Sequence, residues 1–354
     1  INGKVNIPGL EATIIPTNVR YTISGEAEIK DNQYSLKNGV VKDPEGGKGV
    51  LTAWMTNEKY KKVNYFIGVK ANKMLGLNTN ENDNSQFYGK AYATGDVTIK
   101  GDRNKIVLSV DATSSKRSTF FLPLGGRTIS EVNFIKFASR EENAESIVRS
   151  KLAKQREAGK NPTSFEMKMR LTATPLLETE IVMDPITGSS IKATGNGLID
   201  IDIQPDNEVF TINGEYTIDK GTYRFILPNF NLVDKLFTIK NGSWIRWNGD
   251  PLNATLNVDA IYNVKASLAP LLGNQVGMAN RVNVECVMAL KGALTQPDIT
   301  LGIEVPDAGP EEQSALKSVL NTQEAISTQL FFLLFSNSFY ATSNGGTNTG
   351  NIGQ

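Results

Sequence analysis

The sequence predicts a mainly β chain whose strands each carry one apolar and one polar face. Apolar and polar residues alternate over long stretches, as in Ile199–Ile203 and Ile299–Val305. Alternation with period two places successive side chains on opposite faces of a strand, and sheets that alternate in this way are usually antiparallel. Asn-Gly pairs, which favour tight turns, stand beside such strands at residues 38–39, 213–214, 241–242 and 248–249. Alternation fails in two stretches, and we expect helix or loop there.

The composition excludes the common catalytic and metal-binding chemistries. The 354 residues include no histidine and one cysteine, Cys286. A Ser-His-Asp triad, a histidine zinc site, an internal disulfide and a Cys-x-x-Cys site are therefore impossible. Lys+Arg and Asp+Glu both number 37, and this neutral balance gives no general attraction to nucleic acid. We expect a protein that is not an enzyme, holds no cofactor or metal, and binds no nucleic acid.

Two β segments are expected, at residues 1–137 and 164–306. The stretch 97–110 in the first resembles the stretch 288–303 in the second. In each, two apolar residues at alternate positions precede Lys-Gly, and a second alternating strand follows. Stacked hairpins of similar length give such a weak internal repeat.

A charged stretch at residues 138–163 separates the two β segments. Residues 136–160 include seven positive and four negative side chains and show no strand alternation. This composition favours a helix or a solvated loop, which Asn161-Pro162 would end. We expect an insertion at the edge of the sheet, either helical or flexible.

An amphipathic helix is expected over residues 307–340, followed by a flexible tail over 341–354. Proline in the first turn and two carboxylates near the positive end of the helix dipole make Pro310–Glu312 a good start. Apolar residues then recur every three or four positions from Leu316 to Leu334. We expect this helix to cap the sheet. A membrane-surface helix is the less favoured alternative, because its polar face lacks cations.

Two features that suggest chemistry have simpler explanations. Asp200 and Asp202 resemble an acid–base pair, but they occupy the polar face of a strand whose other face is Ile199, Ile201 and Ile203. A solvated face accounts for them. Cys286 lies in an alternating strand on the apolar side, and we expect a buried, unreactive thiol.

Several sequence blocks are familiar from a known family. The most specific is Phe237-Thr-Ile-Lys-Asn-Gly-Ser-Trp-Ile-Arg-Trp-Asn-Gly-Asp-Pro-Leu-Asn-Ala-Thr-Leu256, and another is Gly214-Glu-Tyr-Thr-Ile-Asp-Lys-Gly-Thr-Tyr-Arg-Phe225. Together with neighbouring blocks they cover about 165–335 and resemble the C-terminal region of the TamB family. That family belongs with the AsmA-like proteins of the Gram-negative envelope. Residues 1–137 fit it more loosely.

The resemblance implies a long sheet curled into an open, apolar-lined trough, called a β-taco. It implies a periplasmic location, an inner-membrane anchor upstream of this segment, and an outer-membrane partner of the Omp85 type, similar to TamA. The implied function is movement of phospholipid between the inner and outer membranes. The alternative is a scaffold that helps outer-membrane proteins to insert. The charged stretch and the Gly/Asn-rich tail depart from the family pattern, so the resemblance does not extend to contact between this segment and the partner.

We expect phospholipid acyl chains to lie on the apolar face of the strands. We expect a residue to lie on this face where its immediate neighbours are mostly polar or small. The expected groove lining is Val97, Ile99, Ile106, Leu108, Val110, Ile199, Ile201, Phe225, Phe237, Ile239, Ile245, Trp247, Leu256, Val258, Val284, Met288, Ile299 and Leu301. Two other functions remain open. One is a scaffold that pairs its free strand edges with a client, and the other is an adhesin-like β-sandwich or β-helix.

Overall fold

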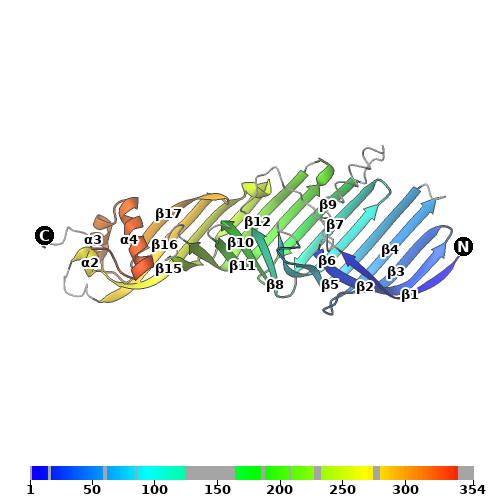
Figure 1. Ribbon diagram of the computed structural model, residues 1–354, viewed down its shortest axis with the longest axis horizontal. Coiled ribbons are helices and arrows are strands. Elements are labelled where there is room, and N and C mark those ends of the chain that lie inside the picture. The colour runs from blue at the N-terminus through cyan, green and yellow to red at the C-terminus, as the bar shows by residue number, and fades with distance from the viewer. Residues whose placement is uncertain are drawn as a thin grey trace.

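The computed structural model describes residues 2–14, 17–58, 62–83, 87–123, 164–184, 188–207, 209–226, 233–273 and 280–341. These residues form one elongated, strongly twisted sheet, with its first strand and the last helices at opposite ends of the long axis (Figure 1). The mainly β fold expected from the alternation is confirmed. The stretch 138–163 lies outside the described residues, as does the tail beyond 341.

Seventeen strands make up the sheet in the described part of the chain. The first eight are β1 (Gly3–Ile14), β2 (Val19–Lys30), β3 (Gln33–Lys42), β4 (Lys48–Glu58), β5 (Lys62–Thr79), β6 (Tyr88–Gly101), β7 (Lys105–Ser114) and β8 (Ser118–Pro123). The next five are β9 (Ser164–Ala173), β10 (Leu177–Asp184), β11 (Ser189–Gln204), β12 (Val209–Ile226) and β13 (Asp234–Ile239). The last four are β14 (Trp244–Gly249), β15 (Thr255–Ser267), β16 (Arg281–Ala293) and β17 (Gln296–Glu304).

Most neighbouring strands are consecutive and antiparallel. The exception lies at the middle of the chain, where β7 pairs with β9 in parallel and β8 pairs with β10 in parallel. Parallel neighbours need a connection that returns the chain to the starting end of the sheet, and the 40 residues between β8 and β9 make that connection. The charged stretch 138–163 lies within this connection and outside the described residues, so the expectation of a helical or flexible insertion there stays a prediction.

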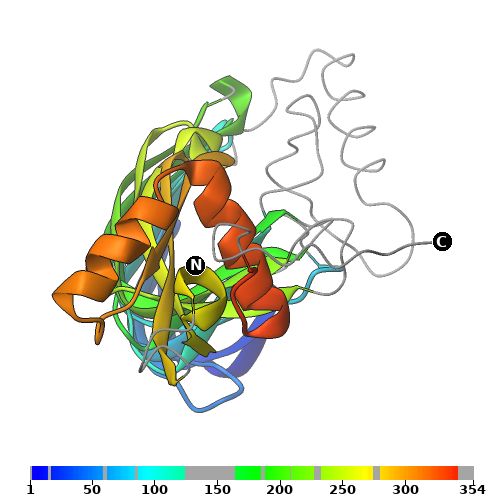
Figure 2. The ribbon, with the colours of Figure 1, turned by 90° about the vertical axis from the view of Figure 1, so that its left-hand side faces the viewer.

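Two long strands hold the halves of the trough together. The N-terminal part of β6 pairs with β8, and its C-terminal part pairs with β7. In the same way β11 pairs with β10 through Ser189–Thr194 and with β9 through Gly197–Ile203. The sheet therefore divides into two walls, β7–β9 and β8–β10, which rejoin at β11. Viewed along the long axis, the sheet is strongly curved rather than flat (Figure 2).

Glycine marks the line along which the walls bend. Gly195 lies where β11 changes partner, beside a register shift in its pairing with β12. A Cβ atom there would lie 2.0 Å from the carbonyl oxygen of Thr217. At Gly89, in the part of β6 that pairs with β8, a Cβ atom would lie 2.2 Å from the carbonyl oxygen of Thr119. Only a residue without a side chain permits strands to approach this closely at a bend.

Helices cover the C-terminal end of the sheet. Besides the short 3-10 turns η3 (Pro205–Asn207) and η4 (Pro251–Asn253), they are α2 (Ala269–Leu272), α3 (Pro310–Val319) and α4 (Gln323–Ser336). The segment expected to form one helix over 307–340 thus forms two. The chain leaves helical geometry at Leu320, and Thr322 takes an extended conformation in which its Oγ1 accepts a hydrogen bond from the Ala325 amide. A threonine in this position starts a new helix.

Candidate functional site

A continuous apolar face runs across the first wall from strand to strand. The register places Ile67, Ile99 and Leu108 side by side, and the row continues through Met167, Ile203 and Phe210. Directly opposed residues share one face of a sheet. A second row, two residues further along each strand, consists of Leu51, Val69, Val97, Val110, Met169, Ile201 and Ile212.

The second wall carries the same face past the bend. One row joins Leu122, Ile181, Ile191, Tyr223 and Phe237, on five successive strands. Ile181 and Ile191 are buried, and Phe237 is fully enclosed. The apolar faces of both walls belong to the same sides of β6, β11 and β12, so they line one concave surface.

All the residues predicted to line a groove lie on this apolar face, but they differ in exposure. Those on the central strands, with Phe225, Trp247 and Leu301, are half-buried: Val97, Ile99, Ile106, Leu108, Val110, Ile199, Ile201, Phe225, Trp247 and Leu301. Those toward the C-terminal end are buried: Phe237, Ile239, Ile245, Leu256, Val258, Val284 and Met288. Ile299, on β17, is 49% exposed. Contact of any of them with a lipid remains a prediction.

Sequence reasoning missed several members of the same rows. Met167 and Met169 lie in β9, and Ile181 and Ile191 lie in β10 and β11. The signal for the methionines is present, because Phe165–Leu171 alternates apolar and charged residues without a break. Ile181 and Ile191 adjoin less regular sequence, and only the pairing of their strands places them on the apolar face.

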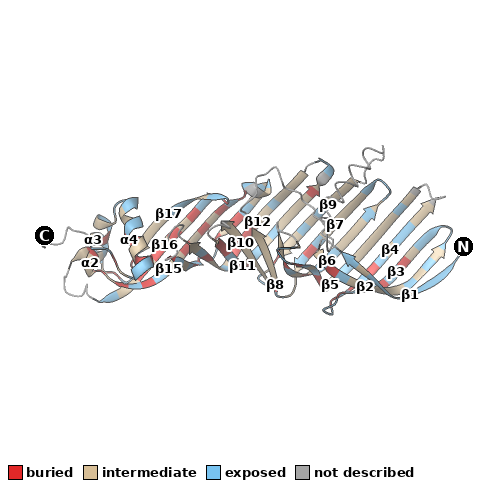
Figure 3. Ribbon diagram, viewed as in Figure 1, coloured by how far each residue is buried: buried red, intermediate tan, exposed pale blue. Residues whose placement is uncertain are grey.

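The exposure of this face changes along the molecule (Figure 3). In β7 every residue from Ile106 to Val110 is half-buried, whereas alternate residues of β16 from Val284 to Leu290 are completely buried. The reason is a cover at the C-terminal end. Leu330, Leu333 and Leu334 of α4 pack into the same hydrophobic cluster as the apolar residues of β15 and β16, and α4 lies on the concave side of the sheet there (Figure 2). The apolar face is therefore covered at the C-terminal end, which we call the closed end, and half-buried along the middle of the sheet.

A buried glutamine fixes the segment that follows α4. Gln329 is 2% exposed, and its side-chain amide donates to the Tyr340 carbonyl oxygen at 3.0 Å while accepting from the Tyr340 amide at 2.8 Å. The chain thus turns back after Asn337, which has a left-handed conformation, and buries Phe339. Helix and return segment form one unit at the closed end.

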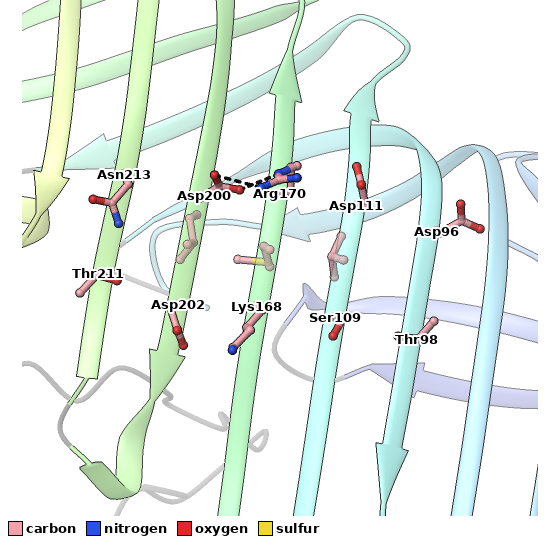
Figure 4. Close-up of a pocket in the computed structure, with 13 residues that line it drawn as sticks. Asp96, Thr98, Ser109, Asp111, Lys168, Arg170, Asp200, Asp202, Thr211 and Asn213 are labelled. Carbon is pink, nitrogen blue, oxygen red and sulfur yellow. Dashed lines mark hydrogen bonds and ion pairs between the residues drawn. The ribbon is translucent and has the colours of Figure 1, made fainter.

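The opposite face of the central strands is polar (Figure 4). One row across it contains Asp96, Asp111, Arg170, Asp200 and Asn213. Arg170 donates from Nε to Asp200 Oδ1 at 2.9 Å, and the ion pair is half-exposed. Asp200 is thus a member of a solvated surface row, as the alternation indicates. Among the described residues, no group of three or more Cys, Asp or Glu side chains is arranged to hold a metal ion.

The single thiol is buried in the covered part of the apolar face. Cys286 is fully enclosed, and burial raises its pKa to about 12. A thiol that stays protonated is a poor nucleophile. The structure therefore gives Cys286 a packing role only.

Comparison with known proteins identifies one family. The family model for the TamB C-terminal domain matches residues 38–354. Comparison with curated proteins finds none that matches. Within the described part of the chain, no helix combines the length and the apolar character that crossing a membrane requires.

Proposed function

The chain belongs to the TamB C-terminal domain family, and from this premise we propose that its open trough carries phospholipid acyl chains across the periplasm between the inner and outer membranes. The family is one of the cell envelope and is associated with the outer-membrane machinery. The proposal of lipid transfer is supported by the partial exposure of the apolar face.

The observation that carries the proposal is the half-buried apolar surface along the middle of the trough. The row from Val69 to Ile212 crosses six strands, and its central residues retain contact with solvent. A monomer rarely leaves so extensive an apolar surface uncovered unless it binds something there. Covering each lipid methylene would contribute about 0.8 kcal/mol. An acyl chain would therefore bind without any specific polar contact.

Head groups would lie at the open side of the trough, in contact with water. The expected lining consists of Val, Ile, Leu, Met, Phe and Trp, which suits acyl chains and gives no means of holding a charge. The proposal needs no cofactor and no catalytic residue. It places the parent protein's inner-membrane anchor upstream of this segment and an Omp85-type, TamA-like protein at the outer membrane.

Arginine in the lining tests the proposal. Ile201→Arg would place a charge in the middle of the trough. A charge among acyl chains costs several kcal/mol of binding free energy unless the side chain reaches water. Thr211→Arg is the matched control. It adds the same charge to the neighbouring strand on the polar face, directly opposite Asp202.

Native mass spectrometry of purified protein provides the first readout, and envelope lipid supply in cells provides the second. We expect co-purified phospholipid in the parent and the Thr211→Arg protein, and its loss from the Ile201→Arg protein. If folded Ile201→Arg protein carries phospholipid and supports lipid supply at the parent level, the trough is not the conduit.

One observation favours a second candidate function, an assembly scaffold. Among the described strands, β1 pairs with β2 alone, and Val5, Leu10 and Ile14 are 48%, 55% and 43% exposed. An exposed edge strand can pair with a strand of another protein. Leu10→Lys distinguishes the two functions. If the chain is a scaffold, the variant should impair outer-membrane protein insertion and still bind phospholipid. If the chain is a lipid conduit, the variant should change neither outer-membrane protein insertion nor phospholipid binding.

A further inference from the structure

The most unusual element of the closed end is α4, whose C-terminal half is apolar on both sides. Its buried side presents Leu330, Leu333 and Leu334 to the trough. Its other side presents a patch that we call the aromatic patch, formed by Phe331, Phe332, Phe335 and Tyr340. A helix that is apolar all round is normally buried on every side. Here one side faces outward.

The rings of the aromatic patch stack in pairs, each pairing a half-buried ring, Phe331 or Phe332, with an exposed one. Phe331 and Phe335 stack with ring centroids 6.0 Å apart, and Phe332 and Tyr340 stack at 4.7 Å. Phe335 and Tyr340 are 49% and 50% exposed. The hydrogen bonds from Gln329 to the Tyr340 backbone hold the return segment against the helix, so the rings are presented on a rigid support.

The patch carries no charge. From Ala325 to Ala341 the sequence contains no Asp, Glu, Lys or Arg, and the exposed polar residues among them, such as Ser327, Thr328 and Ser336, are small and neutral. Protein interfaces usually combine an apolar centre with a polar and charged rim. A neutral aromatic surface instead suits the boundary between lipid head groups and acyl chains, where aromatic rings gather in membrane proteins.

We propose that the aromatic patch of α4 docks the closed end of the trough onto the surface of a lipid bilayer. The 14 residues of α4 reach about 21 Å at 1.5 Å per residue, which is shorter than the ~30 Å core of a bilayer. The helix would therefore lie in the surface of the membrane rather than cross it. The inference rests on the proposed function, because it brings the trough to the membrane with which it exchanges lipid.

The lack of charge gives the docking a distinctive signature. Most membrane-surface helices use Lys and Arg to bind anionic lipids, and such binding weakens as salt screens the charges. Docking through this patch would depend on apolar area alone. We expect equal binding to neutral and anionic vesicles, and no loss of binding between low and high salt.

Vesicle flotation tests the proposal with the purified chain. The probes are vesicles of phosphatidylcholine, with or without phosphatidylglycerol. The test variant is Phe335→Ser with Tyr340→Ser, which removes two exposed rings and keeps the backbone hydrogen bonds to Gln329. The control variant is Leu198→Ser with Leu236→Ser, which removes exposed apolar side chains of 50% and 58% exposure outside the patch.

We expect the parent and the control variant to float with both kinds of vesicle, and the test variant to bind roughly tenfold more weakly. Circular dichroism checks that each variant is folded. A folded Phe335→Ser single variant replaces the double variant if the latter unfolds, with a smaller expected loss. Failure of the parent to float, binding that needs anionic lipid, or equal binding by the test variant would overturn the proposal.

Two further measurements separate the alternatives. Native mass spectrometry reports phospholipid in the trough independently of flotation, so flotation without bound phospholipid would contradict the lipid conduit but not the docking. Size-exclusion chromatography reports self-association. A parent dimer that the test variant cannot form would assign the patch to a second copy of the chain and overturn the membrane docking.

Discussion

At the scale of single residues, the bend of the trough depends on positions where a side chain has no room. Gly195 lies on β11 between the parts that pair with the two walls. The atom nearest to a Cβ atom built there is a backbone oxygen, at 2.0 Å. A flexible side chain could move away, but a backbone oxygen moves only if the strand moves. Replacement of this glycine therefore strains the junction between the walls.

We predict that Gly195→Ala lowers the free energy of unfolding by about 2 kcal/mol or more, as an overpacked site does. Gly302→Ala is the control, because a Cβ atom there would lie 3.5 Å from Val287 Cβ, an ordinary contact. Urea denaturation of the two variants measures the difference. Equal stability of Gly195→Ala and Gly302→Ala would show that the bend does not require glycine.

At the scale of elements, the sequence predicts strands better than it predicts their connections. Alternation identifies β7, β11, β16 and β17, because a half-exposed strand must alternate. It cannot identify the parallel pairing of β7 with β9, since both parallel and antiparallel neighbours of a one-sided sheet alternate. The direction of β9 depends on the connection between β8 and β9. The charged sequence of that connection has no strand or turn pattern from which the direction could be predicted.

The break between α3 and α4 shows a second limit of the sequence. Apolar spacing continues from Leu316 to Leu334 and predicts one helix. Asn321 and Thr322 are moderate helix formers that prefer caps, and the packing of α4 against β17 decides that the chain turns there. The weak helix preferences of Asn321 and Thr322 are therefore overridden by tertiary contacts.

Thr322 tests whether the cap starts α4. Its Oγ1 accepts from the Ala325 amide at 3.1 Å. We predict that Thr322→Ala costs about 1 kcal/mol, which would speed amide exchange in the first turns of α4 about fivefold. Thr328→Ala, on the exposed side of the same helix, should leave exchange unchanged or slow it slightly, because alanine favours helix. Faster exchange in both variants would indicate that α4 is destabilised by any change, not by loss of its cap.

At the scale of the whole molecule, the apolar face is one surface that α4 covers at the C-terminal end and leaves half-buried along the middle. The rows of the central strands and those of β15 and β16 follow from the same alternation, and the sequence alone places both on one face. It does not reveal their difference in burial, because that depends on where α4 lies. Met288 and Val97 have equivalent positions in their hairpins, Met288 opposite Leu301 and Val97 opposite Val110. Met288 is completely buried, whereas Val97 is half-buried.

This gradient predicts an order of local stability and a place for lipid. Regions with few buried apolar contacts open at lower free energy than the packed core. Amide exchange should therefore be fastest in β1, intermediate in β7, β9 and β11, and slowest in β15 and β16. Added phospholipid should protect the amides of β7, β9 and β11, where the face is open. It should leave β15 and β16 unchanged, because α4 already covers them. Hydrogen exchange with mass spectrometry measures all of these strands in one experiment, and short-chain lipid that does not form vesicles avoids protection caused by docking at α4. Protection spread evenly over the sheet, or confined to β15 and β16, would mean that lipid does not occupy the open part of the trough.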